Sequence, residues 1–396
     1  MKLNKLLILI TFLSLGMMLT AKSTVEPIKK IKVGKHREFV INGKPFFPIM
    51  SWAQPKKNYA MLNEIGINTF CGDATPESAK EAGCYAITNF KAGQVENGHV
   101  LAWIFPDEPD MAAGKGAKAK PRMSAEKVVA ECNKIHSSTP KRLVFMTFTG
   151  DFRKKSSTYP PEVWEKIYPE FIKGADVLGF DIYPIYGSGD AGHLNMVGSG
   201  VADLTQLAGT RPVYTWIETS KGSQWMTYEK QPEVLPMHTR NEVWQAIING
   251  ATAIGYFTHV WKPEFKEYGP TPEMTKELTR INAQITRLAP AILAGKVKNK
   301  IEMALGEGLK CSFKATKYEG STYLFSENND LGPGAEKAKQ FDPIFPRPGK
   351  AVFTISGLKA GSKIEVIDEQ RTITAENGKF SDDFAPLAEH IYKVKL

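Results

Sequence analysis

Short apolar runs that end in polar residues recur along most of the chain. The clearest is the run at residues 101–109, LAWIFPDEP, whose uncharged part stops at Pro106 and is followed by Asp107 and Glu108. A run this short and this apolar predicts a strand buried on both faces, as in a parallel sheet. A second run, residues 211–220, ends in the same way at Glu218. Because ligands bind beyond the carboxyl ends of parallel strands, both glutamates are predicted at a ligand-binding edge.

Strand-like and helix-like segments alternate between residues 46 and 293. The predicted strands are residues 46–52, 67–72, 84–90, 100–106, 142–148, 176–183, 212–217 and 253–260. The predicted helices are residues 58–65, 76–82, 124–137, 161–173, part of 189–207, 239–249 and 272–293. This alternation over ~250 residues predicts a (β/α)8 barrel, a TIM barrel of the α/β class. An open doubly wound sheet is the alternative, but no glycine-rich phosphate turn follows an early strand.

The beginning of the chain has a different pattern. Lys2 and Lys5 precede an apolar run at residues 6–20, and Ala21 offers a small residue for cleavage. We expect residues 1–21 to be a secretory signal peptide and the protein to be periplasmic or extracellular. The alternative, an uncleaved anchor, needs ~20 apolar residues to span a membrane. Residues 37–52 then predict a strand, an Asn-Gly turn and a second strand that leads into the barrel.

After Gly295 the apolar spacing changes to a period of two, with turn signals such as Glu307-Gly308 and Asn377-Gly378. Strands are predicted at residues 318–325, 351–355, 363–367 and 390–394, and residues 328–348 as a long loop. We therefore divide the chain into a signal peptide at 1–21, a barrel at 22–295 and a β-sandwich at 296–396. The sandwich is expected to pack on the side of the barrel as a structural module.

Composition narrows the class of protein. The chain is 42% hydrophobic and 23% charged, as in soluble globular proteins. Its formal charge of +9 becomes +7 once Lys2 and Lys5 leave with the signal peptide, and the basic residues are spread along the chain. This favours solubilising charge over nucleic-acid binding. The four cysteines have no metal-binding spacing, which favours buried free thiols. No HExxH motif supports a metal site, and no GxSxG motif supports a serine nucleophile. We also expect no cofactor, and we expect a monomer.

The two strand-end glutamates suit glycoside hydrolysis. Glu108 follows the fourth predicted strand and Glu218 ends the seventh. A retaining glycosidase places two carboxyl groups ~5–5.5 Å apart, one as nucleophile and the other as acid and then base. Each glutamate alone could equally be a charged strand end or a cap for the following turn. Together on one barrel they predict glycoside hydrolysis.

Several motifs resemble one known group of enzymes. INGKPFFPIMSW, PDEP, DVLGFDIYP, WIETS and FTHVW, within residues 38–262, are similar to clan A, the retaining (β/α)8-barrel glycoside hydrolases with glutamates on strands 4 and 7. The terminal GKFSDDFAPLAEHIYKV resembles the β-domain often attached to them. The resemblance implies that Glu108 is the acid/base and Glu218 the nucleophile. It also implies that Tyr183 hydrogen-bonds the nucleophile and that Trp261 floors the sugar subsite.

One position departs from the clan A pattern. Most members have asparagine before the strand-4 glutamate, where it contacts the sugar 2-hydroxyl, and this chain has Asp107. An aspartate accepts hydrogen bonds but donates one only when protonated. The sugar preference of the site is therefore open.

Other residues are candidates for substrate contact. Rings can stack on sugar faces, which makes Trp225 the second choice after Trp261 and adds Trp52; each could instead belong to the core. His259 and Asp73 follow strands eight and two, and each could be a satisfied polar group. The loop at residues 111–122, MAAGKGAKAKPR, could be a lid that meets anionic sugar, but a solvated loop is favoured.

Two other classes of function stay open. The first is a non-catalytic carbohydrate-binding protein in which Asp107 has removed catalysis. The second is a different polysaccharide-modifying enzyme on the same barrel, a lyase or a deacetylase. A transglycosylase would use the same residues as the hydrolase. Product analysis separates these classes, because only a lyase leaves an unsaturated sugar and only a deacetylase releases acetate.

Overall fold

The structure is a computed structural model that describes residues 24–105, 107–114, 118–153, 158–306 and 309–396. The predicted signal peptide, Pro106 and the Glu307-Gly308 turn lie outside the described residues. In the part that is described, no helix is both long and apolar enough to cross a membrane.

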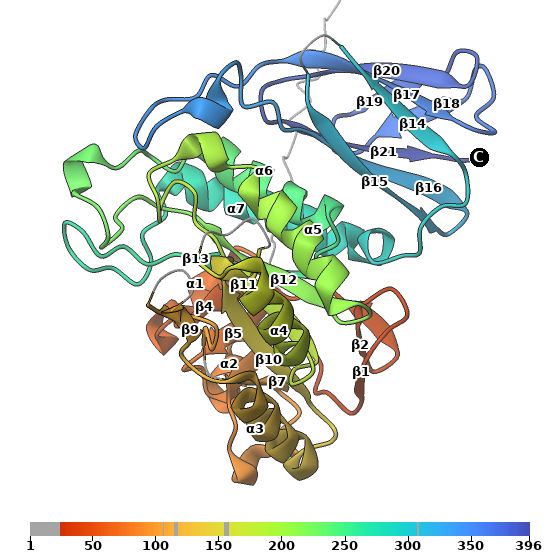
Figure 1. The fold of residues 1–396 in the computed structure, drawn as a ribbon. Coiled ribbons are helices and arrows are strands. Elements are labelled where there is room, and N and C mark those ends of the chain that lie inside the picture. Colours follow the sequence, from red (N-terminus) through yellow and green to blue (C-terminus); the bar gives the residue numbers. More distant parts are fainter. Residues whose placement is uncertain (1–23, 106, 115–117, 154–157, 307–308) are drawn as a thin grey trace, which may run out of the picture.

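Eight parallel strands close into a barrel in the order of the chain, which confirms the predicted (β/α)8 fold (Figure 1). The barrel strands are β4 (Ile49–Trp52), β5 (Thr69–Gly72), β6 (Tyr85–Asn89), β7 (Val100–Ile104), β10 (Leu143–Thr149), β11 (Val177–Asp181), β12 (Val213–Glu218) and β13 (Ala253–Phe257). The barrel is closed by β13 pairing with β4, where Ile254 lies opposite Ile49. Each predicted strand is present, most with shorter ends.

Helices follow seven of the eight strands. They are α1 (Tyr59–Glu64), α2 (Pro76–Glu81), α3 (Ala125–Ser138), α4 (Pro161–Phe171), α5 (Met196–Ala208), α6 (Pro236–Ile248) and α7 (Pro272–Ile292). After β6 the link is the short 3-10 turn η2 (Ala92–Gln94), as the sequence predicted. Helix α3 begins where the Ser124 side chain accepts a hydrogen bond from the Lys127 backbone, and Thr271 caps α7 in the same way.

Aromatic rings fill the inside of the barrel where glycines make room for them. The Tyr214 ring stacks on Phe145 with centroids 4.1 Å apart, and Trp216 packs edge-on against Trp52 at 5.4 Å. A Cβ atom at Gly179 would lie 2.0 Å from the Tyr214 ring, and one at Gly255 would lie 2.2 Å from Trp216. Trp216 is therefore part of the core, and the barrel is packed rather than hollow.

A small antiparallel sheet precedes the barrel. It contains β1 (Ile31–Val33), β2 (Phe39–Ile41) and β3 (Lys44–Phe46), and the predicted Asn42-Gly43 turn connects β2 to β3. Both turn residues have positive φ, 51° and 86°, which asparagine and glycine tolerate. The predicted strand at 46–52 is corrected here, because β3 ends at Phe46 and the barrel strand starts at Ile49. Strand β1 was not predicted.

The C-terminal part forms two facing antiparallel sheets. One contains β14 (Ile301–Leu305), β17 (Gly349–Ile355) and β20 (Lys379–Phe384). The other contains β15 (Cys311–Tyr318), β16 (Ser321–Asn328), β21 (Glu389–Val394), β18 (Lys363–Val366) and β19 (Arg371–Thr374). Phe353 of the first sheet packs on Tyr392 of the second, with ring centroids 5.5 Å apart. The predicted strand at 318–325 is corrected, because Glu319-Gly320 is a hairpin turn between β15 and β16.

The second sheet packs on two barrel helices, α6 and α7 (Figure 1). The Phe325 ring of β16 stacks on Trp244 of α6 at 6.0 Å, and the Thr316 hydroxyl of β15 donates to the Ala291 carbonyl of α7 at 2.7 Å. The four cysteines are free thiols; three are buried, and Cys311 is partly exposed.

Candidate active site

Glu108 sits on an unusual backbone at the carboxyl end of β7. Its φ is 49°, a left-handed conformation that is costly for a residue with a side chain. Its N–H donates to the Thr147 carbonyl of β10 at 3.1 Å. The Arg122 guanidinium donates to the carbonyl oxygens of Asp107 and Glu108 and lies 4.0 Å from the Glu108 carboxyl group. The surrounding chain thus holds Glu108 in a strained and defined position.

Three carboxyl groups meet beside β7: Asp107, Glu108 and Asp181, the last residue of β11. The Asp181 and Glu108 side chains are in hydrogen-bond contact. Burial, and then the negative charges of Glu108 and Asp107, hold the pKa of Asp181 well above its usual range. Burial, followed by the charge of Glu108, raises the pKa of Asp107 to about 6. Asp107 is exposed and the other two are partly exposed, so this cluster is open to solvent, and Asp181, with its raised pKa, keeps its proton to higher pH than a free aspartate.

The turn after Glu108 is fixed by a buried aspartate. The Asp110 carboxyl accepts hydrogen bonds from the Thr149 backbone and hydroxyl, both at 2.9 Å, and from the Tyr168 hydroxyl at 2.8 Å. Burial raises the pKa of Asp110 to about 7. This second aspartate of the PDEPD motif anchors the loop below the cluster and does not face solvent.

Glu218, the last residue of β12, is almost completely buried, with 1% of its surface exposed. Its two carboxyl oxygens accept hydrogen bonds from the backbone N–H groups of Ile185 at 3.0 Å and Tyr186 at 2.6 Å. Its carboxyl group also contacts that of Glu242, a fully buried residue of α6. Burial is the first cause that raises the pKa of both groups, so this pair shares a proton as well.

The two predicted catalytic glutamates therefore have different carboxyl partners. Glu108 contacts Asp181 in the open cluster, whereas Glu218 contacts Glu242 under the loop that follows β11. The resemblance implied a hydrogen bond from Tyr183 to Glu218, but the donors to Glu218 are the backbone groups of the next two residues. Tyr183 instead lies close to the Asp107, Glu108 and Asp181 cluster, whose charges help to raise its pKa.

An aromatic surface is defined by Tyr186, Trp225, Phe257, His259, Trp261 and Phe265. It reaches Glu218 through the Tyr186 N–H, and it approaches the acidic cluster through Tyr183, whose ring centroid lies 5.1 Å from that of Phe257. Its residues come from the loops after β11 and β12 and from the end of β13 and the loop that follows. Neighbouring rings contact each other at centroid distances between 4.9 and 6.4 Å. Trp225, Trp261 and Phe265 are 59%, 40% and 48% exposed. Exposed rings in this number offer faces on which sugar rings can stack.

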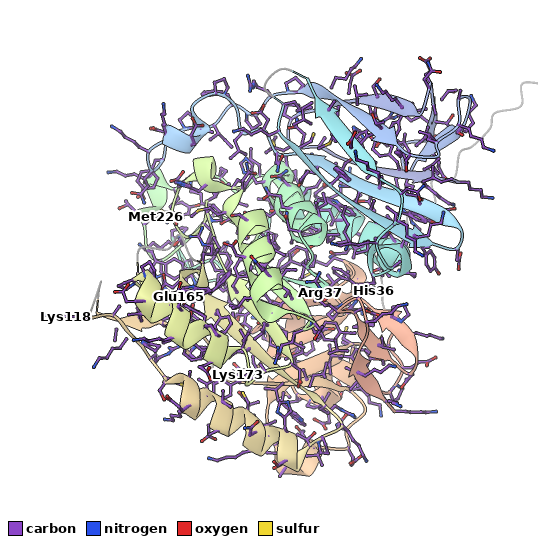
Figure 2. The ribbon with its side chains drawn as sticks, turned by 45° about the vertical axis from the view of Figure 1, so that its right-hand side comes forward. His36, Arg37, Lys118, Glu165, Lys173 and Met226 are labelled. Atoms are coloured by element: carbon purple, nitrogen blue, oxygen red, sulfur yellow. The ribbon has the colours of Figure 1, made fainter. Side chains whose placement is uncertain are left out.

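The remaining candidates lie around the same end of the barrel. Trp52 is partly exposed at the end of β4 and packs on Trp216. Asp73 is exposed just after β5. His259 is 6% exposed, its side chain contacts the Ala53 backbone, and burial lowers its pKa. In Figure 2, Met226, from the loop after β12, lies on the left with Lys118, whereas Arg37, before β2, lies on the right.

The loop at residues 111–122, for which a solvated loop was favoured over a lid, forms a small hairpin where it is described. Strand β8 (Ala112–Ala113) pairs with β9 (Lys120–Pro121), and Lys115 lies outside the described residues. Arg122, which follows β9, is the residue of this hairpin that contacts the end of β7. In the described ranges, no group of three or more His, Cys, Asp and Glu side chains is arranged to hold a metal ion.

Sequence reasoning missed three residues of the site. Asp181 ends β11 but lay two residues inside the predicted strand at 176–183, so a correct strand end would have selected it together with Glu108 and Glu218. Tyr186 and Glu242 had no such pattern. Tyr186 is part of an irregular loop, and Glu242 lies inside a helix where a single glutamate resembles an ordinary surface residue.

Comparisons with known proteins support the fold. A scan of protein-family models finds no match to the chain, and a search of curated protein sequences finds none either. Solved structures do match. An alpha-amylase from Geobacillus thermoleovorans has a TM-score of 0.53 at 9% identity, covering 86% of this chain and 91% of its own. A glycoside hydrolase family 5 protein from Bacteroides vulgatus has a TM-score of 0.52 at 10% identity, covering 94% and 95%. These identities are low enough that the likeness is one of fold.

Proposed function

We propose that this protein is an exported, monomeric, cofactor-independent retaining glycoside hydrolase that cleaves β-glycosidic bonds in a polysaccharide or oligosaccharide. The observation that carries the proposal is an open acidic cluster next to exposed aromatic rings, at the carboxyl ends of the barrel strands. The matching solved structures named above are an amylase and a glycoside hydrolase, which adds support from proteins of the same fold.

The proposed reaction is a double displacement. Glu218 attacks the anomeric carbon while Glu108 protonates the departing glycosidic oxygen, and a covalent glycosyl–Glu218 ester forms. Glu108, now ionised, takes a proton from water, and the resulting hydroxide attacks the ester and releases the sugar with retained configuration. Asp181, whose raised pKa keeps its carboxyl group protonated, hydrogen-bonds to Glu108. Trp225 and Trp261 bind the faces of the sugar rings.

The burial of Glu218 means that the proposed reaction needs a conformational change. Glu218 is 1% exposed, and its carboxyl group lies under the backbone of Ile185 and Tyr186, so the loop after β11 must shift when sugar binds. The two backbone N–H groups also stabilise the ionised carboxylate, which is the form that attacks.

The test is turnover by three variants on a panel of aryl β-glycosides and β-linked polysaccharides, with the products sized. We expect Glu218→Gln to abolish turnover. We expect Glu108→Ala to lose about 10²–10⁴-fold on polysaccharide and to recover with azide on activated aryl glycosides, as loss of a general acid–base does. Glu126→Gln, at an exposed glutamate that opens α3, is the matched control and should leave turnover unchanged. Full activity of Glu218→Gln would contradict the assignment.

A second candidate function is favoured by the closed state of Glu218. A non-catalytic carbohydrate-binding protein would use the aromatic surface and keep Glu218 as a structural carboxyl group, hydrogen-bonded to backbone. In that case Glu218→Gln retains all sugar binding, no variant changes a product distribution, and Trp225→Ala and Trp261→Ala weaken binding. Measuring turnover and binding on the same polysaccharides separates the two functions.

A further inference from the structure

A long segment of the C-terminal domain lies against the loops at the active-site end of the barrel. We call residues 329–348, between β16 and β17, the bridging segment. The Phe341 N–H donates to the Gly189 carbonyl at 2.7 Å, and the Gln340 amide donates to the Ser188 carbonyl at 2.8 Å and lies 3.8 Å from the Met226 sulfur. Figure 1 shows this segment in blue beside the barrel loops. Its regular structure is limited to the 3-10 helix η7 (Ala335–Lys337), and connections as long as this one are uncommon and often functional.

Buried polar groups hold both ends of the bridging segment. Asp330, which is 1% exposed, accepts a hydrogen bond from the Gly332 N–H and pairs with Arg347, both at 2.9 Å. The buried Asn328 amide donates to the Arg347 carbonyl at 2.7 Å and to the Ala385 carbonyl at 3.0 Å. The surface that the segment presents is therefore preorganised, which lowers the entropy lost on binding a ligand.

The segment encloses a small pocket with an exposed aromatic ring. The pocket has a volume of about 220 Å³, and its lining includes Phe345, Leu331, Lys337 and Asp342. Phe345 is 71% exposed, more than any other large hydrophobic side chain of the described residues. A free ring face can stack on the C–H face of a sugar, while an ammonium and a carboxylate bind its hydroxyl groups. A volume below the ~300–1,000 Å³ of drug-sized pockets suits a single sugar ring.

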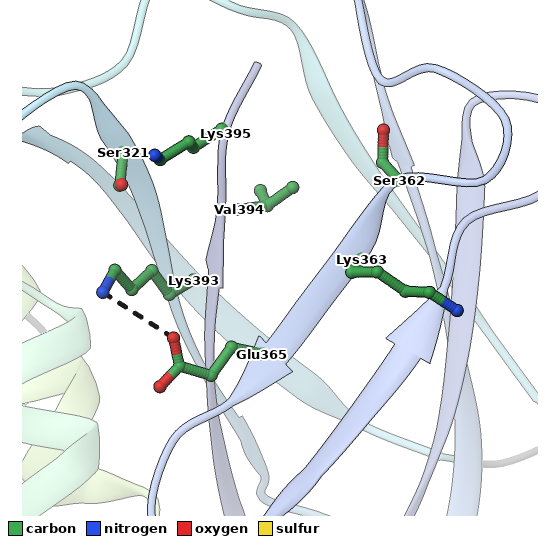
Figure 3. Close-up of a pocket in the computed structure, with 7 residues that line it drawn as sticks. All are labelled: Ser321, Ser362, Lys363, Glu365, Lys393, Val394 and Lys395. Carbon is green, nitrogen blue, oxygen red and sulfur yellow. Dashed lines mark ion pairs between the residues drawn. The ribbon is translucent and has the colours of Figure 1, made fainter.

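A larger hollow in the same domain lacks these features. It has a volume of about 380 Å³ and is lined by Ser321, Ser362, Lys363, Glu365, Lys393, Val394 and Lys395 (Figure 3). None of these residues is aromatic, and the Lys393 ammonium already pairs with Glu365 at 3.7 Å. Volume alone therefore does not identify a sugar-binding pocket. The exposed Phe345 ring and the contacts of the bridging segment with the barrel loops favour the smaller pocket.

We propose that the pocket at Phe345, Lys337 and Asp342 is a carbohydrate subsite, and that it binds a sugar unit of the same chain that is cleaved at the barrel. The bridging segment connects the two sites: Phe341, next to the pocket residue Asp342, packs at Gly189 with Met226, and Met226 follows the exposed Trp225. This inference rests on the proposed function and assigns the C-terminal domain a part in choosing long substrates over short ones.

The experiment uses Phe345→Ala in the full chain and compares retardation in native gels that contain barley β-glucan, xylan, galactomannan or alginate. Leu305→Ala, at an exposed apolar residue of β14 in the same domain, is the matched control. We expect Phe345→Ala to weaken binding of the retarding polysaccharide by about 5- to 10-fold, the loss of one aromatic contact, and Leu305→Ala to leave it unchanged. Equal retardation of Phe345→Ala and wild type, or retardation by none of the four, overturns the subsite.

Hydrolysis of a short aryl β-glycoside, measured on the same proteins, separates this inference from the proposed function. We expect Phe345→Ala to keep the wild-type kcat/KM on this substrate, because one sugar unit at the barrel does not extend to the pocket. If wild type binds polysaccharide through Phe345 but hydrolyses nothing, the hydrolase proposal fails and the subsite stands. If it hydrolyses both substrates and Phe345→Ala changes neither, the subsite fails alone.

Discussion

At the scale of single residues, each proposed catalytic carboxyl group has a second carboxyl group in contact with it. Glu108 contacts Asp181 in the open cluster, and Glu218 contacts Glu242 inside the protein. Two adjacent carboxyl groups resist double ionisation, so each pair keeps a proton at a pH where an isolated glutamate would have lost it. Burial raises the pKa of Asp181, Glu218 and Glu242, and Asp181 and Glu242 are the acidic neighbours of the two residues that are proposed to react.

The role of Glu242 is testable through the pH dependence of the reaction. Burial raises the pKa of Glu218, and the nucleophile must be ionised, so kcat/KM rises as pH rises through that pKa. In Glu242→Gln an amide donates to the carboxylate and favours its ionised form, so we expect this limb to move to lower pH by about one unit. In Glu242→Leu the side-chain hydrogen bond to Glu218 is lost, while burial and the two backbone hydrogen bonds remain, so the limb moves to higher pH. Profiles from about pH 4 to about pH 9 check both directions.

A purely structural role for Glu242 would give a different result. Both variants would then lower the melting temperature, and the pH profile of the remaining activity would keep the wild-type shape. Opposite shifts of the two profiles are what distinguish a positioning residue from a packing residue.

At the scale of elements, strand ends were predictable and helix interiors were not. Period and turn signals located all eight barrel strands, and Glu108 and Glu218 were correctly placed at strands four and seven. Helix α6 was predicted at 239–249, but its pattern of apolar residues did not indicate which face is buried. The reason is that barrel strands cover one side of α6 and the C-terminal sheet covers the other, so nearly all its residues are buried. The burial of Glu242 could therefore not be predicted from its position in the helix.

The strand geometry depends on glycines that admit large rings. Gly179→Ala would place a Cβ atom 2.0 Å from the Tyr214 ring inside the barrel. We expect it to destabilise the protein by about 1–3 kcal/mol through overpacking, measured by chemical denaturation. Gly93→Ala, in the 3-10 turn after β6, is the matched control because its Cβ atom would meet nothing within 4 Å. Equal stability of the two variants would contradict the packing described for the barrel.

At the scale of the whole molecule, the barrel and the C-terminal sheets share an interface. The presence of antiparallel sheets after the barrel was predicted from the change in apolar period. The position of the bridging segment was not, because its contacts with Gly189 and Met226 join residues over 100 positions apart and leave no local pattern. Long-range contacts of irregular segments are the part of this fold that periodicity cannot supply.

One buried carboxyl group makes the stability of this interface depend on pH. Glu327 of β16 is fully buried and accepts a hydrogen bond from Asn241 of α6 at 2.7 Å, and burial holds its pKa well above its usual range. The folded state therefore keeps a proton that the unfolded chain loses above pH ~4.3, so stability falls as pH rises. Glu327→Gln removes this dependence. We expect its stability relative to wild type to increase by up to about 1.4 kcal/mol for each pH unit, measured by denaturation at acidic and alkaline pH.

The central claim is that Glu218 attacks the sugar, although it is buried in the free protein. The most direct measurement is to incubate the protein with 2-deoxy-2-fluoro aryl β-glycosides, which accumulate the covalent intermediate, and to locate the label by peptide mass spectrometry. We expect one fluoroglycosyl group, attached to Glu218, and no label in Glu218→Gln. A label on Asp181 or another carboxyl group, or hydrolysis of these glycosides without any covalent label, would contradict it.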